Sequence, residues 1–174
     1  MRRFIAVLLV ALCAACAPFL PRYSVPQDAE ATGFYEDQQR PDLALLEFRL
    51  ANYFARDERP YETVCAVDGS EMKGSQQEVP VALDADIERK LLRRFPSLTP
   101  AGGCKREGLS VKDSDTGVEA ALFDVHDLEC ESADKCSAWG GYYANGQHGW
   151  SWYWLEWNGR NWKIRPRDLG IVLT

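Results

Sequence analysis

Two histidines are the starting point for chemistry in this chain, because no others occur among its 174 residues. His126 lies in the run DVHD (residues 124–127), so Asp124 and His126 point to the same side if this segment is a strand. A carboxylate beside an imidazole can exchange protons with a substrate. The alternative is a polar, exposed strand end, which we favour because residue types without geometry do not define an active site. His148, in the run GQHG, is expected in a loop.

Other catalytic and metal-binding patterns are missing from the sequence. It contains no serine nucleophile elbow, no phosphate loop and no HExxH motif. Asp113, Asp115 and Gly117 have the spacing of a calcium-loop fragment, but the further oxygen ligands of such a loop do not follow. A plain hairpin turn is therefore expected there. We predict no metal and no cofactor, and a protein that binds rather than catalyses.

All six tryptophans lie within residues 139–162. The run WSWYWLEW (residues 150–157) is rich in aromatic residues, which favour strands. The pair Asn158-Gly159 follows and favours a tight turn, because both residues tolerate positive φ angles. Residues 162–165 form the return strand, which Pro166 ends. Such a hairpin is not stable alone, so the rest of the chain must cover at least one of its faces.

Alternation of side chains divides this hairpin into two faces. Matching apolar with apolar residues places one set toward the core: Tyr153, Leu155, Trp162 and Ile164. The opposite face is aromatic with a cationic edge and carries Trp150, Trp152, Trp154, Lys163 and Arg165. Aromatic rows can stack on sugars, peptides or lipids, so we predict a binding surface that also includes Tyr143 and the loop 141–149. The alternative is that the same rings are buried against the N-terminal helix.

Four cysteines besides Cys16 lie in the C-terminal two thirds of the chain: Cys65, Cys104, Cys130 and Cys136. An even set of cysteines in an oxidising compartment indicates two disulfides, and four cysteines allow three pairings. We favour Cys65–Cys104 and Cys130–Cys136, the second closing a short loop between strands. Zinc is the alternative, but no CxxC spacing occurs in this part of the chain.

The N-terminus has the layout of a secretory signal. Arg2 and Arg3 precede an apolar stretch (residues 4–15) that is too short to span a bilayer. The run LCAAC ending at Cys16 resembles the lipobox of bacterial lipoproteins. The resemblance implies that Cys16 is lipidated and anchors the chain to a membrane, and Ala17 at the next position implies the outer membrane. The alternative is cleavage after Ala17 and secretion to the periplasm.

Composition divides the chain into three parts. Residues 1–16 are the signal, residues 17–40 with three prolines form a flexible tether, and residues 41–174 form one domain. The net charge of −6 has no basic stripe to offset it, which argues against a nucleic-acid partner. A membrane, an envelope protein and a small ligand remain as predicted partners.

The elements expected in the domain are helices first and strands afterwards. Apolar spacing predicts a helix over residues 41–56, and a second helix that Asp84 or Asp86 caps and Pro96 ends. Between them we expect a short strand (63–67) and a polar loop (68–78). Strands are then expected over four segments: 104–111, 118–126, 137–143 and the tryptophan hairpin. This order predicts an α+β domain with N-terminal helices packed on a curved antiparallel meander.

The order of these segments, with the runs VCAV (64–67), GYY (141–143) and GRNWKI (159–164), resembles uncharacterised periplasmic proteins with NTF2-like, cystatin-related folds. The resemblance covers roughly residues 41–174. It implies a cone-like sheet with a pocket, and no particular activity. Because NTF2-like enzymes place Asp and His in their cone, it also implies an alternative function, a small enzyme that uses Asp124 and His126 as an acid–base pair.

Overall fold

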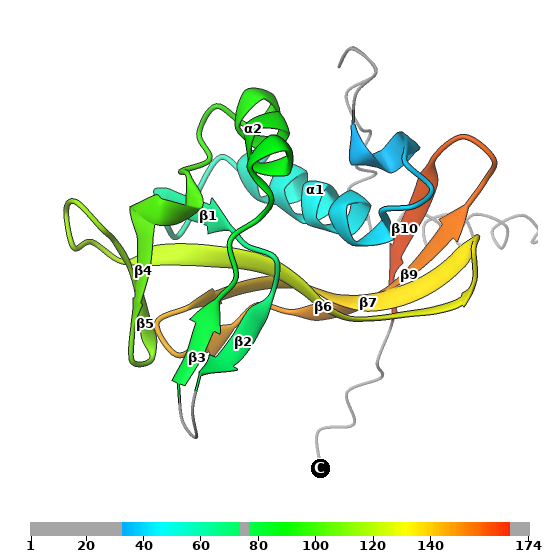
Figure 1. Cartoon of the computed structure of the whole chain (residues 1–174). Coiled ribbons are helices and arrows are strands. Elements are labelled where there is room, and N and C mark those ends of the chain that lie inside the picture. The colour runs from blue at the N-terminus through cyan, green and yellow to red at the C-terminus, as the bar shows by residue number, and fades with distance from the viewer. Residues whose placement is uncertain (1–32, 74–76, 168–174) are drawn as a thin grey trace, which may run out of the picture.

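The computed structural model describes residues 33–73 and 77–167, and of strand residues 70–73 and 77–79 it describes the backbone alone. Two helices lie on one side of a curved sheet, and two small hairpins project from its other side (Figure 1). The predicted α+β class, with helices on one face of a largely antiparallel sheet, is confirmed. The described part holds no helix that is both long and apolar enough to cross a membrane.

The main sheet has the strand order β1-β6-β7-β9-β10, with β8 paired to β7. All its neighbours are antiparallel except β1 and β6, which run parallel. The strands are β1 (Thr63–Ala66), β6 (Ala120–Ser132), β7 (Lys135–Ala144), β8 (Gln147–His148), β9 (Ser151–Trp157) and β10 (Trp162–Pro166). The predicted C-terminal meander is therefore confirmed, and the early strand joins its edge.

Two hairpins differ from what the sequence predicted. The segment expected to be a polar loop contains β2 (Ser70–Lys73) paired with β3 (Gln77–Pro80). The segment expected to be one strand is a hairpin of β4 (Cys104–Glu107) and β5 (Ser110–Asp113). Gly108 turns the chain between them with a φ of 61°, a conformation that glycine adopts without steric cost. A two-residue turn beginning with glycine is the signal that the single-strand prediction overlooked.

Both predicted helices are present, as α1 (Pro41–Phe54) and α2 (Ala85–Arg94). Pro41 occupies the first turn of α1, where its missing N–H has no intrahelical partner to lose. Asp84 caps α2, and its side chain accepts a hydrogen bond of 2.8 Å from the Asp86 backbone N–H. Two short 3-10 helices, η1 (Phe34–Glu36) and η2 (Ala101–Gly103), complete the described elements.

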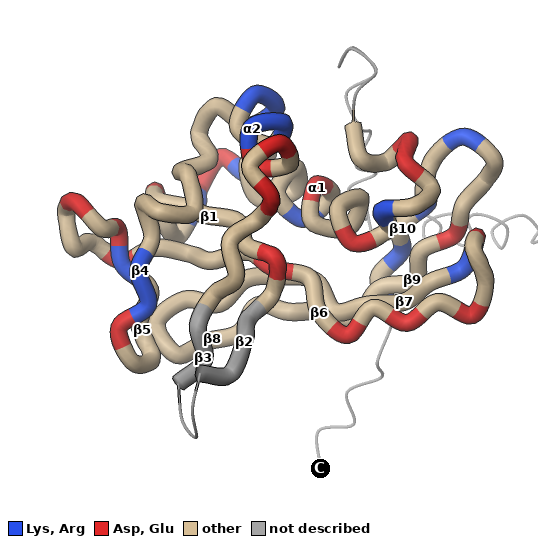
Figure 2. The backbone as a smooth tube through the Cα atoms, in the orientation of Figure 1, with Lys and Arg blue, Asp and Glu red and all other residues tan. Residues whose placement is uncertain are grey.

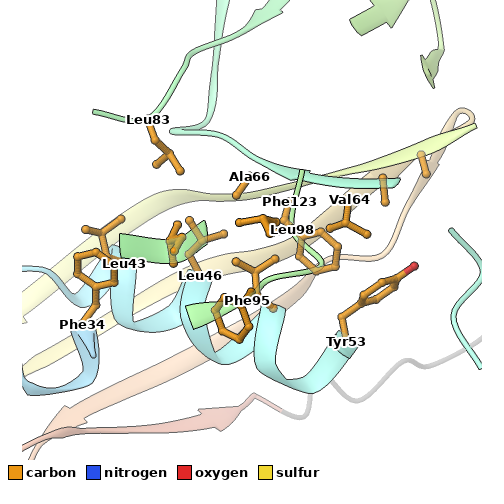
Figure 3. Close-up of a cluster of buried hydrophobic side chains, with 14 residues drawn as sticks. Phe34, Leu43, Leu46, Tyr53, Val64, Ala66, Leu83, Phe95, Leu98 and Phe123 are labelled. Carbon is orange, nitrogen blue, oxygen red and sulfur yellow. The ribbon is translucent and has the colours of Figure 1, made fainter. Parts of the chain in front are cut away.

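The core lies between α1 and the sheet (Figure 3). The leucines of α1 and Tyr53 pack against β1 and β6, where Phe123 is fully buried. A second cluster joins α1 to the C-terminal hairpin through Leu45, Tyr153 and Trp162. Residues 34–37, which the sequence placed in the tether, also pack here, since Phe34 is buried and the Asp37 carbonyl accepts a 2.9 Å hydrogen bond from the Trp162 indole.

One ion pair is embedded at the edge of this core. Glu47 of α1 is fully buried, and its carboxylate pairs with the guanidinium of Arg94, the last residue of α2. Burial raises the pKa of Glu47 above its ordinary value, and the nearby Arg94 charge opposes that rise. The pair therefore links the two helices at a cost in desolvation.

Both predicted disulfides are present. Cys65–Cys104 connects β1 to the start of β4, and Cys130–Cys136 joins paired positions of β6 and β7. The first bond fixes the β4–β5 hairpin to the sheet. There Val111 of β5 packs on Ala120 and Leu122 of β6. This contact covers one end of the sheet face that lies opposite α1.

Candidate functional site

The tryptophan hairpin has the two faces that alternation predicts. The strand register places Ile164 opposite Leu155 and Arg165 opposite Trp154. Tyr153, Leu155 and Trp162 are at most 4% exposed, so the predicted core face is core. Trp152 and Trp154 project from the other face, away from α1, and Trp154 is 43% exposed.

Neighbouring strands extend the aromatic character of this outer face. Trp152 of β9 lies opposite Trp139 of β7, and Trp139 lies opposite His126 of β6. The rings therefore form a row across three strands, which we call the aromatic belt. Its members are His126, Trp139, His148, Trp150, Trp152 and Trp154.

Five of the six rings of the belt contact one another in sequence. Trp152 meets Trp139 edge to face, with ring centroids 5.2 Å apart. The planes of Trp139 and His126 are nearly parallel at 6.5 Å, and His126 meets Trp150 edge to face at 4.4 Å. His148 continues the row 4.5 Å beyond Trp150. Edge-to-face and offset pairs of this kind are the arrangements that aromatic rings favour, so these contacts stabilise the row.

Gly141 allows Trp150 to pack closely against β7. A Cβ at this position would be 2.5 Å from Cδ1 of Trp150, so any larger residue would push the indole away. Arg49 of α1 supports the same region, because it donates hydrogen bonds to the Tyr153 hydroxyl (2.5 Å) and to the Gly149 carbonyl (3.2 Å). The predicted loop 141–149 is partly strand, with Asn145 and Gly146 turning the chain at positive φ into β8.

Cations stand at both ends of the row. Arg106 lies over the Tyr143 ring at 4.6 Å, and Tyr143 contacts His148 at 5.1 Å. Tyr143 itself is only 6% exposed, and its hydroxyl donates to the Leu109 carbonyl at 2.7 Å. Tyr143 therefore packs beneath the belt and is not part of the exposed binding surface that the sequence predicted. At the other end Arg167 lies 5.2 Å from the Trp154 ring.

Asp124 and His126 share a face, as alternation predicted, and that face is the belt side of the sheet. Oδ2 of Asp124 is 3.6 Å from Nδ1 of His126. Asp124 is only 9% exposed, and its Cα pairs with that of Gly141, the residue under Trp150. The pair lies outside the space between α1 and the sheet, because Phe123 and Val125 point into that core.

Three polar atoms at the belt are buried without a hydrogen-bond partner in the described structure. They are Oδ1 of Asp124 and the indole nitrogens of Trp150 and Trp152. Buried polar groups usually have partners, since an unsatisfied one costs about 1–3 kcal/mol. The three atoms lie within the aromatic belt, on the face of the sheet opposite α1.

A shallow pocket of about 230 Å³ continues the belt beyond Trp152. Trp154 forms one wall and Cys136 another, and charged side chains form the rim: Glu131, Lys135 and Glu156. Ligand pockets for drug-sized molecules are larger, so this one suits a single ring or a short side chain.

The two edges of the outer face carry opposite charges. Figure 2 shows acidic residues along the C-terminal half of β6, where Glu129 and Glu131 are exposed. Exposed Lys163 and Arg165 lie on β10, as predicted for the cationic edge. The belt runs between these edges. Within residues 33–73 and 77–167, no three His, Cys, Asp or Glu side chains lie close enough together to hold a metal ion.

The structure thus brings together residues that the sequence named separately. Trp150, Trp152 and Trp154 share a face with Asp124 and His126. Three contributors were not predicted from the sequence: Trp139, Arg106 and Arg167. His148 was included only as part of the loop 141–149, and the place of Trp139 in the row follows from the pairing of β7 with its neighbours.

Comparison of the chain with protein families, with curated proteins and with solved structures finds no match. The geometry of the belt is therefore the basis for assigning a function.

Proposed function

We propose that this protein is a non-catalytic binding domain of the bacterial cell envelope, and that the aromatic belt is its ligand surface. The observation that carries the proposal is the row of contacting rings that remains partly exposed on the face opposite α1. Tryptophan and tyrosine side chains are enriched among the residues that contribute most of the binding energy at interfaces. The curved sheet and its helices are consistent with the NTF2-like resemblance, in which case the ligand binds outside the cone.

The proposed location rests on the N-terminal signal and the lipobox-like run at Cys16, which lie outside the described residues. Two disulfides support an oxidising compartment. Lipidation at Cys16 would hold the domain at the outer membrane, and secretion to the periplasm is the alternative. The intact mass of protein made with its native signal should shift when Cys16→Ser is introduced, because the variant has no thiol to carry the acyl groups. An unlipidated wild-type mass would overturn the anchor.

The binding proposal predicts that Trp152→Ala removes ligand binding. Suitable probes are a neutral tetrasaccharide, a basic peptide and anionic phospholipid vesicles, each tested for a rise in melting temperature and a change in tryptophan emission. We expect at least one probe to bind the wild type and to lose about tenfold or more in affinity with Trp152→Ala. Trp157→Ala is the matched control, because Trp157 is on the same strand with its side chain toward the α1 face.

The alternative function is a small enzyme that uses Asp124 and His126 as its acid–base pair. The observation that favours it is the 3.6 Å separation between Oδ2 and Nδ1. His126→Ala separates the two functions. Retained binding with no conversion of any bound probe supports the binding domain, whereas turnover that His126→Ala abolishes would replace it with the enzyme.

A further inference from the structure

We propose that the ligand of the aromatic belt is a neutral glycan, a linear chain of sugars whose hydroxyl groups pair with Asp124 and with the indole N–H groups of Trp150 and Trp152. This inference rests on the proposed binding function and names its ligand class.

The polar atoms without partners set the first requirement on the ligand. An ionised Asp124 can only accept hydrogen bonds, and an indole N–H can only donate them. A ligand that satisfies both must therefore carry donors and acceptors close together. Asp124 and Trp150 are neighbours, because the Trp150 indole lies over Gly141 and the Cα of Gly141 pairs with that of Asp124.

Charge argues against a cation, an anion or a lipid surface as the ligand. A cation would pair with Asp124 but would leave the two indole N–H groups without acceptors. An anion would accept from the indoles, but Asp124 in the same row would repel it. A lipid surface would bury the Asp124 carboxylate, which is already largely buried, still further from water, where an unpaired charge is most costly. A hydroxyl group both donates and accepts and carries no charge.

The aromatic rings of the belt set the second requirement on the ligand. Indole and imidazole faces carry negative charge density, which attracts the weakly positive C–H groups on the face of a sugar ring. The belt offers several such rings in contact, at centroid separations of 4.4–6.5 Å from His148 to Trp152. A row of this kind suits a chain of repeated rings better than a single small molecule.

The pocket beside Trp154 suits the terminal sugar of the glycan. Its volume of about 230 Å³ has room for a single ring, and Glu131, Lys135 and Glu156 at its rim offer both acceptors and donors to hydroxyl groups. We therefore place one sugar in this pocket and the following sugars along Trp152, Trp139 and Trp150. The buried polar atoms become reachable as the indoles rotate around the bound chain.

Calorimetric titration with two β-1,4-linked tetrasaccharides, cellotetraose and chitotetraose, tests this inference on the mature protein. At least one is expected to bind at millimolar concentration or below. Asp124→Asn and Trp152→Ala should each weaken that binding about 10- to 100-fold, since a hydrogen bond to a charged group and a stacked ring each contribute on that scale. Trp157→Ala should leave it unchanged.

The outcomes separate the glycan from the binding function itself. If neither tetrasaccharide binds but the basic peptide or the anionic vesicles bind in a way that requires Trp152, the glycan is excluded and the binding surface stands. If no probe binds, or if binding survives Trp152→Ala, both are overturned. Circular dichroism of Asp124→Asn and Trp152→Ala confirms folding. The conservative Trp152→Phe, which keeps a ring at the position, should retain part of the affinity.

Discussion

Replacing Arg94 with methionine is expected to lower the free energy of unfolding by about 3–5 kcal/mol at neutral pH, because it leaves the Glu47 carboxylate buried without its cation. The loss should be smaller at acidic pH, where a protonated Glu47 needs no counter-charge. The Glu47→Leu/Arg94→Met double variant is expected to recover most of the loss, because two apolar side chains do not have to be desolvated as ions. Urea unfolding of the three proteins across pH measures all of these effects.

The stability of the wild-type protein should also depend on pH through Glu47. Burial raises the folded-state pKa of Glu47 above its value in the unfolded chain, so the folded state holds a proton more tightly. The corresponding stability is fully present below the unfolded pKa of about 4.3 and is lost as the pH rises through the folded pKa. Glu47→Gln should remove this decline. If the wild type and Glu47→Gln respond identically to pH, Glu47 is not buried as described.

Removing the Cys65–Cys104 disulfide is expected to lower the free energy of unfolding by about 4 kcal/mol. The bond joins residues 39 positions apart, and a cross-link of that span restricts the unfolded chain more than a short one does. The Cys130–Cys136 bond spans only 6 positions, so its removal should cost about 2 kcal/mol. Paired cysteine-to-alanine variants, unfolded in urea, provide the comparison.

The two disulfide variants should also differ in what they do to the belt. Without Cys65–Cys104, the β4–β5 hairpin loses its covalent link to β1 at the end of the face where Tyr143 and Val111 pack. We expect weaker ligand binding in that variant than in the Cys130–Cys136 variant, measured where both are folded. Equal stability losses in the two variants would contradict the expected dependence on the length of the closed loop.

The elements that local pattern specifies were predictable. Leucine spacing and Pro41 identified α1, and Asp84 identified the start of α2. Alternation along residues 150–157 and the Asn158-Gly159 turn sorted Tyr153 and Leu155 from Trp152 and Trp154, because a strand has only two faces. Cysteine count and compartment led to the two disulfides.

Pairing between distant segments was not predictable in the same way. Whether Trp139 meets Trp152 depends on the register of β7 with β9, which no local signal fixes. The position of His126 beside Trp150 further depends on the turn at Asn145 and Gly146. The belt is a product of sheet register, and for that reason the sequence revealed only the part of it that lies on β9 and its flanks.

Acrylamide quenching of tryptophan fluorescence tests the central claim, an exposed aromatic surface opposite a buried one, most directly. Wild type is compared with Trp154→Phe, which changes the 43% exposed ring, and with Trp162→Phe, which changes a ring only 3% exposed on the core face. The predicted result is a readily quenched component that Trp154→Phe reduces and Trp162→Phe leaves in place. Protection of all the tryptophans in the wild type, or loss of the quenched component only with Trp162→Phe, would contradict the account.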